Sequence, residues 1–153
     1  MAGDTATCCD LWAKFDHPNG EILRTAHWRV VVRPKQVTLG ALVLISARHV
    51  EALSALEPVE AAELPQVAAA LEARLRRVFA PDKINYLALM MVDPHLHFHV
   101  LPRYAQPRTV AGYTFTDPSW GGPPRLEAPV PGDDVVGAVR AWLREPSAPD
   151  ATR

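Results

Sequence analysis

The sequence predicts an α+β domain in which an antiparallel sheet of about five strands carries one long helix. Histidine alternates with apolar residues from His95 to Val100, which is the pattern of a strand with one polar and one apolar face. A stretch rich in Ala, Leu, Glu and Arg that ends near Phe79 repeats apolar residues at spacings of three and four, as a helix packed on a sheet does. A chain of 153 residues is long enough for one domain with a sizeable core.

The remaining elements follow from the turn residues between them. Residues 1–20 form a polar, flexible lead-in that closes with a turn at His17–Gly20. Pro65 lies inside the long helical stretch and predicts either a kink or a helix that begins near it. A short final helix is expected within residues 132–145. Five strands are expected, at residues 21–25, 27–33, 41–46, 84–91 and 95–104.

A flap rich in proline and glycine is expected at residues 105–131, without strong periodicity. Tyr113, Phe115 and Trp120 favour packing over disorder, because disordered segments contain few aromatic residues. Two interpretations remain open. The flap covers the substrate site or a partner subunit's edge, or it only seals the exposed face of the sheet.

The composition is typical of a small cytoplasmic enzyme. The net charge of −1 gives no indication of a nucleic-acid or anionic-membrane partner. No apolar run approaches the ~20 residues of a membrane span, and the N-terminus lacks the basic-then-apolar pattern of a signal peptide. We therefore expect a cytoplasmic protein without nucleic-acid or membrane partners.

The alternation places His95, His97 and His99 on one face of a strand, with neighbouring imidazoles about 6.5–7 Å apart. One interpretation is a solvated edge strand that happens to be rich in histidine. A second is a metal site, although three collinear positions need a bend to converge on one ion. The third is phosphoryl or nucleotidyl transfer, in which a neutral imidazole is the nucleophile. The spacing alone does not decide between metal and phosphate.

The segment from His95 to Arg103, HLHFHVLPR, resembles the histidine triad motif of the HIT superfamily of nucleotide hydrolases and transferases. Residues 28–50 resemble the paired strands that precede the long helix in these proteins. Residues 111–118, AGYTFTDP, resemble a tail segment of a bacterial short-loop subgroup described as diadenosine tetraphosphate hydrolase-like. The resemblance extends over residues 20–125 and implies a HIT-like fold and a homodimer.

The resemblance also implies roles for the three histidines. His97 would attack the α-phosphorus of a (di)nucleoside polyphosphate and form a covalent nucleotidyl intermediate that water releases. His99 would bind oxygens of the α-phosphate, and His95 would support the same charge or the leaving group. This mechanism requires no metal, and we expect no cofactor. The partner implied is a small-molecule nucleotide substrate.

Three further residues are candidates for substrate binding. Arg33 stands where several family members carry a ribose-binding Asn, and would contact ribose or a distal phosphate. Asn85, on the strand before the motif, is either a substrate ligand or a satisfied structural amide. Arg103 directly follows the motif, where it would reach phosphate or remain a surface charge.

The chain departs from the family pattern at two places near the phosphate. Ala41 follows Gly40 where many members have histidine, and Met90 and Met91 replace a polar pair that precedes the motif. A site with fewer hydrogen-bond donors stabilises the transition state less. An alternative function is therefore a nucleotide-binding protein with little catalysis, and a third is a His-ligated metal enzyme.

Cys8 and Cys9 are the only cysteines. Some HIT proteins bind structural zinc through a Cys-x-x-Cys pair and histidines, but here Trp12 stands where the second thiolate would fall. Adjacent cysteines have poor geometry for sharing one tetrahedral ion. We therefore interpret His49, which matches a zinc histidine of such members, as a polar residue at a strand end or helix start, and expect no metal.

Overall fold

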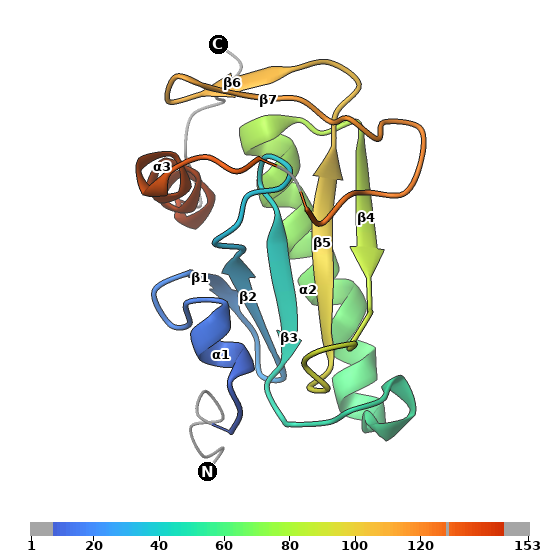
Figure 1. The fold of residues 1–153 in the computed structure, drawn as a ribbon. Helices are drawn as coiled ribbons and strands as arrows, with labels where there is room; N and C mark the ends of the chain where they lie inside the picture. The colour runs from blue at the N-terminus through green and yellow to red at the C-terminus, as the bar shows by residue number, and fades with distance from the viewer. Residues whose placement is uncertain (1–7, 128, 146–153) are drawn as a thin grey trace.

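The computed structural model describes residues 8–127 and 129–145. Its centre is a five-stranded antiparallel sheet, as the sequence predicts, and the strand order is β1-β2-β3-β5-β4 (Figure 1). The strands are β1 (Glu21–Arg24), β2 (Trp28–Val32), β3 (Leu42–Ser46), β4 (Lys83–Leu87) and β5 (His97–Arg103).

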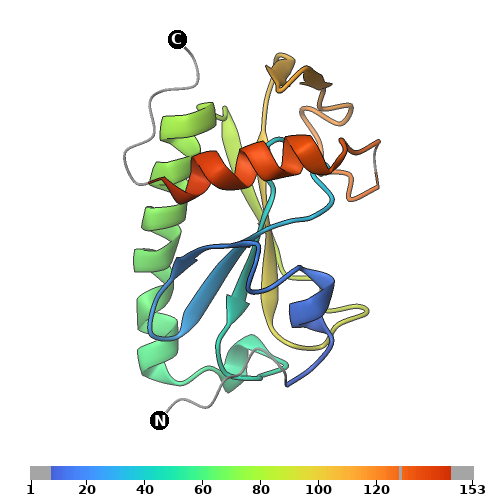
Figure 2. The same ribbon diagram turned by 90° about the vertical axis from the view of Figure 1, so that its left-hand side faces the viewer.

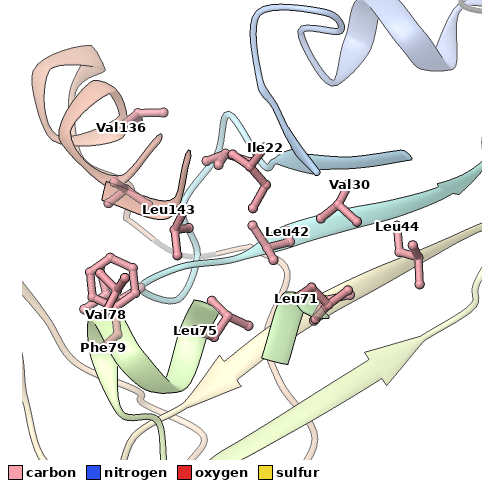
Figure 3. Close-up of a cluster of buried hydrophobic side chains, with 14 of the residues drawn as sticks. Ile22, Val30, Leu42, Leu44, Leu71, Leu75, Val78, Phe79, Val136 and Leu143 are labelled. Carbon is pink, nitrogen blue, oxygen red and sulfur yellow. The ribbon is translucent and has the colours of Figure 1, made fainter. Parts of the chain in front are cut away.

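The long helix α2 (Pro58–Phe79) packs on one face of this sheet. A capping box between Glu57 and Glu60 starts the helix, so it does not begin near Pro65 but runs through it. Apolar side chains of α2 meet alternate residues of the central strands and form the main core (Figure 3). The cluster includes Val30, Leu42, Leu44, Val67, Leu71 and Leu75.

Two shorter elements complete this layer. The 3-10 helix η2 (Leu53–Ala55) leads into α2, and α3 (Asp133–Arg144) ends the described chain as the sequence predicts. The helix α3 lies across α2 and contributes Val136 and Leu143 to the core (Figure 2). No helix in the described part of the chain is long and apolar enough to cross a membrane.

The opposite face of the sheet is covered by α1 (Leu11–Lys14), so that α1 and α2 lie on opposite sides of it (Figure 2). The structure here corrects the expected lead-in, because residues 8–20 fold onto the sheet. Trp12 and Phe15 are buried, and with Leu11 they cover a smaller core. Its strand residues are Val31, Val43 and Ile45. The functional side chains lie on this face.

The motif strand is shorter than the sequence pattern suggests, because β5 begins at His97. His99 pairs with Val43 and His97 pairs with Ile45, which places both imidazoles on the α1 face. The preceding strand β4 ends at Leu87 instead of continuing to Met91. Residues 89–93 instead form a loop beside the start of β5.

The flap contains ordered structure. Strands β6 (Arg108–Val110) and β7 (Tyr113–Phe115) form a hairpin, and Phe115 enters the main core. The buried guanidinium of Arg103 then holds the next loop through Asp117 and Ser119. The expected packing of the aromatic residues applies to Phe115, whereas Trp120 is 43% exposed.

Candidate active site

A cavity of about 350 Å³ opens on the α1 face of the sheet. Its floor is formed by His97 and His99 of β5, and Phe15 closes one side. The apolar loop 89–92 and, from the end of the flap, Leu126 with Glu127 complete the wall. A cavity of this size accommodates a small ligand. The flap therefore contributes to a site as well as to the covering of the sheet.

His97 has one defined tautomer. Its Nδ1 lies 2.7 Å from the backbone carbonyl oxygen of His95, which accepts hydrogen bonds only, so Nδ1 carries the proton. The Nε2 atom makes no hydrogen bond within the described residues and keeps its lone pair. Burial lowers the pKa of His97, which keeps the imidazole neutral at physiological pH. A neutral imidazole with one free nitrogen is a potential nucleophile.

His99 lies beside it, with 5.1 Å between the two ring centroids. Its Nδ1 atom is buried and has no hydrogen-bond partner within the described residues. Burial, followed by the nearby His97 and Arg33, lowers the pKa of His99 to about 4. A buried ring nitrogen without a partner is costly, and a ligand oxygen in the cavity would satisfy it.

His95 does not share this cavity, although the alternation predicts three imidazoles on one face. It precedes β5, is fully buried, and does not line the cavity. Its Nε2 donates to the carbonyl oxygen of Ser46 at 2.7 Å. Its Nδ1 therefore carries the lone pair, and it points toward Cys9 Sγ at 3.3 Å. The resemblance implies that His95 supports charge on the substrate, but the structure does not place its ring at the cavity.

Around His95 the fold assembles a cluster of soft ligands. One ligand atom from each of Cys8, Cys9, His49 and His95 lies within 4.8 Å of the others. His49 Nδ1 is 3.6 Å from Cys8 Sγ. The sequence pattern favours His49 as a polar residue at a strand end or helix start, whereas the structure places its ring beside both thiols.

The surroundings of this cluster suit a metal ion such as zinc, which takes thiolate and imidazole ligands. Each imidazole turns Nδ1 inward while its Nε2 meets an oxygen, at 3.1 Å from Glu51 for His49 and at 2.7 Å from Ser46 for His95. Oxygen partners of this kind orient metal-bound histidines. Burial opposes ionisation of Cys8, but hydrogen bonds from Trp12 and His49 lower the pKa of this thiol on balance.

Arg33 reaches the cavity from the turn that follows β2, together with Lys35. The turn is held by Gln36, whose buried side-chain amide donates to the carbonyl oxygens of Arg33 and Ala41, each at 2.8 Å. Ala41 itself is fully buried beside Val37 and does not line the cavity. Met90 and Met91 do line it.

Asn85 and Arg103 lie elsewhere. Arg103 follows His99 by four residues, roughly 13 Å along a strand, and lines a separate cavity with Asn85. Its guanidinium is neither at the surface nor free for phosphate, because it contacts Asp117 at 2.5 Å and Asn85 at 2.8 Å. The structure thus brings Arg33, but neither Asn85 nor Arg103, together with the histidines.

Sequence reasoning missed two basic residues of the cavity, Lys14 and Lys35. The sequence contains one signal that could have indicated them, the rarity of lysine. The chain has only three lysines, at positions 14, 35 and 83, and thirteen of its sixteen Lys and Arg residues are arginine. Two of these three lysines line the same cavity.

Comparison with known proteins identifies relatives of this fold. A model of the HIT domain matches residues 18–106. No curated protein matches the chain. A histidine triad protein from Marinobacter aquaeolei is 21% identical, with 81% of this chain and 85% of that chain covered and a TM-score of 0.65. One from Sinorhizobium meliloti is also 21% identical, with 82% and 88% covered and a TM-score of 0.64.

A zinc-bound histidine triad family protein from Mycobacterium smegmatis is 18% identical, with 84% and 86% covered and a TM-score of 0.58. At such identities the structures show a shared fold. The family model goes further, because its match spans more than half of the chain, including the sheet, α2 and the triad segment. This chain belongs to the HIT domain family.

Proposed function

We propose that this protein hydrolyses nucleotides at the α-phosphate, cleaving a phosphoanhydride or phosphoramidate bond of a (di)nucleoside polyphosphate. HIT family members are generally nucleotide hydrolases or transferases, and some only bind nucleotides. The observation that carries the proposal is the 2.7 Å hydrogen bond from His97 Nδ1 to the His95 carbonyl oxygen. It leaves Nε2 free and unprotonated beside the cavity, as a nucleophile requires.

In the first step the Nε2 lone pair of His97 attacks the α-phosphorus. A nitrogen–phosphorus bond forms, and the bond from phosphorus to the leaving group breaks, so that the leaving group departs with the electron pair. A phosphate leaves as its oxyanion, whereas the amine of a phosphoramidate takes a proton from solvent as it leaves. In the second step water attacks phosphorus, the nitrogen–phosphorus bond breaks, and the nucleoside monophosphate leaves. The proton of the water passes to solvent, and His97 returns to its neutral form.

The neighbouring residues supply binding and orientation. The unpartnered Nδ1 of His99 offers a hydrogen bond to an α-phosphate oxygen. Phe15 and the apolar loop 89–92 line the same cavity and suit the nucleoside. The likeness of residues 111–118 to the short-loop subgroup makes diadenosine tetraphosphate the first substrate to test.

We propose in addition that Cys8, Cys9, His49 and His95 hold zinc, as the zinc-bound relative from M. smegmatis suggests. When bound, the ion would join the segment before α1 to the triad segment, which is a structural contribution. The nucleophilic step takes place on His97, which lines the cavity, whereas the cluster does not.

We also propose a cytoplasmic homodimer. The strand β4 is an edge of the sheet with only one partner. Tyr86 and Leu89, on and just after this strand, are 38% and 44% exposed. An open edge with apolar neighbours favours association with a second copy.

A second candidate function is nucleotide binding with little turnover. Met90 and Met91 line the cavity, where their thioethers supply no hydrogen-bond donor to a charged transition state. Such a site would bind phosphate through His99 and the nearby cations, yet accelerate its transfer only weakly.

Replacing His97 separates the two functions. His97→Asn should keep the fold and bind nucleotide while losing nearly all turnover, because an amide nitrogen is not a nucleophile. Mass spectrometry after rapid quenching without acid should find a nucleotidyl adduct on wild type and none on the variant. His27→Asn, remote from the cavity, serves as the control. A wild type that turns over no faster than His97→Asn would support the binding function instead.

His99→Asn should reduce turnover less than His97→Asn, because it removes a phosphate contact and not the bond-forming atom. His95→Asn should act through the position of His97 and through the cluster. Equal residual rates in all three variants would contradict His97 as the nucleophile.

A further inference from the structure

More basic than acidic side chains line the cavity beside His97. Three basic side chains line it, Lys14 from α1 and Arg33 with Lys35 from the turn after β2. Two acidic side chains, Asp93 and Glu127, line it as well. An excess of cations in a concave site attracts anionic ligands.

Among these residues, Arg33 gives the strongest indication of an anionic ligand. Its side chain is half-buried, and its guanidinium donates to the carbonyl oxygen of Lys35 at 2.8 Å. Its Nε atom is buried without a hydrogen-bond partner, and no carboxylate pairs with it among the described residues. A desolvated guanidinium without an anion is unfavourable, and an anionic ligand would satisfy it.

Lys14 has a partner, but an exchangeable one. Its Nζ lies 2.5 Å from Asp93 Oδ2, and the side chains of Lys14 and Asp93 are 48% and 17% exposed. Because the lysine end of the pair is exposed to solvent, a phosphate oxygen in the cavity can compete with this carboxylate for Nζ. Asp93 then acts as a competitor for the cation that the ligand needs.

The position of the cations indicates which part of a nucleotide they bind. Arg33 and Lys14 each lower the pKa of His99, so both lie within electrostatic range of the imidazole floor. Neither makes a hydrogen bond to His97 or His99 within the described residues. Both line the same cavity as His97 and His99, where phosphates next to the α-phosphate would come within their reach.

We infer that Lys14, Arg33 and Lys35 form a subsite for the phosphates of the leaving group. This inference depends on the proposed function, because it specifies which class of substrate the same site prefers. The preferred substrates are nucleotides whose leaving group carries two or more phosphates. Phosphoramidates, whose leaving group is an amine without phosphate, would leave these cations unpaired.

Calorimetry with inorganic tripolyphosphate and inorganic phosphate tests the subsite without any turnover. Wild type should bind tripolyphosphate at least about tenfold more tightly, because each added charge-assisted contact is worth roughly a factor of ten. Lys14→Ala should weaken tripolyphosphate binding about tenfold and phosphate binding much less. Asp93→Asn should strengthen tripolyphosphate binding, since it removes the competing carboxylate.

Lys83→Ala is the matched control, because Lys83 is an exposed lysine that does not line this cavity. Arg33→Gln extends the test to the half-buried guanidinium, and its melting temperature must match wild type before its affinity is compared. Equal affinities of wild type for both anions would overturn the inference. So would an equal loss in Lys83→Ala and Lys14→Ala, which would indicate bulk charge alone.

Kinetics link the subsite to specificity. For Lys14→Ala the ratio of kcat/KM for diadenosine tetraphosphate to that for adenosine 5′-phosphoramidate should fall about tenfold. An unchanged ratio would overturn the inference even if the His97 adduct forms. If no adduct forms but tripolyphosphate binding follows the expected pattern, the proposed hydrolysis fails and the subsite stands.

Discussion

Replacing Gln36 tests whether one buried amide holds the turn that brings Arg33 and Lys35 to the cavity. Its Nε2 donates to the carbonyl oxygens of Arg33 and Ala41, each at 2.8 Å, and its Oε1 accepts from the backbone N–H of Gly40 at 2.9 Å. The side chain is fully buried. Gln36→Ala removes all three hydrogen bonds.

The size of the effect follows from the groups left without partners. The Ala41 carbonyl keeps the backbone N–H of Arg33 as a donor, at 2.9 Å. The Arg33 carbonyl and the Gly40 N–H lose the hydrogen bonds that Gln36 supplies, and each unsatisfied buried group costs about 1–3 kcal/mol, so we expect a loss of about 2–6 kcal/mol. For a domain of this length that corresponds to a fall in melting temperature of about 4–24 °C.

Gln36→Glu separates the hydrogen bonds from the shape of the side chain. A carboxylate still accepts from Gly40 but faces two carbonyl oxygens with no proton to donate, and burial raises its pKa. The variant should be least stable near neutral pH. It should regain stability as the pH falls through the raised pKa, because the protonated acid donates to one carbonyl.

The assay is denaturation by heat and by urea, with Gln66→Ala on the exposed face of α2 as control. Tripolyphosphate affinity should fall in Gln36→Ala, because the turn that carries two cations of the subsite is no longer held. A melting temperature within about 2 °C of wild type would refute the assigned role of Gln36, given the scale expected for two unsatisfied groups.

Three further predictions concern other parts of the molecule. Hydrogen bonds from Arg48 lower the pKa of Glu60 from 4.5 to about 2. The stability that this ion pair contributes above pH 4.5 should therefore be lost as the pH falls toward 2. Urea midpoints measured over this pH range should show the decline in wild type and lack it in Glu60→Gln. Metal analysis should find about one zinc per chain in wild type and less in Cys8→Ser or His49→Asn. An equal zinc content in a variant lacking both thiols would contradict zinc binding by this cluster. Light scattering should give a mass near twice 16.8 kDa, and a stable monomer at micromolar concentration would contradict the homodimer.

Periodicity located the motif strand and the long helix, because their apolar residues recur at fixed spacings. The strand over His97 to Arg103 and the helix ending at Phe79 both follow from spacing alone. Periodicity could not locate α1, since its four residues are too few to establish a helical repeat. Trp12 and Phe15 cover the sheet through tertiary contacts that no local pattern reports.

Spacing predicted the site only where its residues share one strand, whereas Arg33 was found through the family resemblance. His97 and His99 are neighbours on β5, so alternation places both on one face. Lys14 and Lys35 lie 21 positions apart in sequence and come from different elements, so only the fold brings them to one cavity. Arg103 was misplaced for the opposite reason. Nearness in sequence suggested nearness to phosphate, whereas four strand residues carry it well beyond the cavity.

His95 lies on the predicted face beside Trp12 but, unlike His97 and His99, does not line the cavity. The backbone N–H of Leu96 donates to the Val50 carbonyl, and the Leu96 carbonyl accepts from the backbone N–H of Ser46, so this segment is held by the end of β3 and the chain that follows it, and not within β5. The His95 side chain consequently meets the thiols, while its carbonyl oxygen still meets His97 Nδ1. One residue therefore contacts both the cluster and His97, through different atoms. A change in the cluster can reach His97 by moving that carbonyl, and an effect by this route should appear in the rate of adduct formation before it appears in nucleotide affinity.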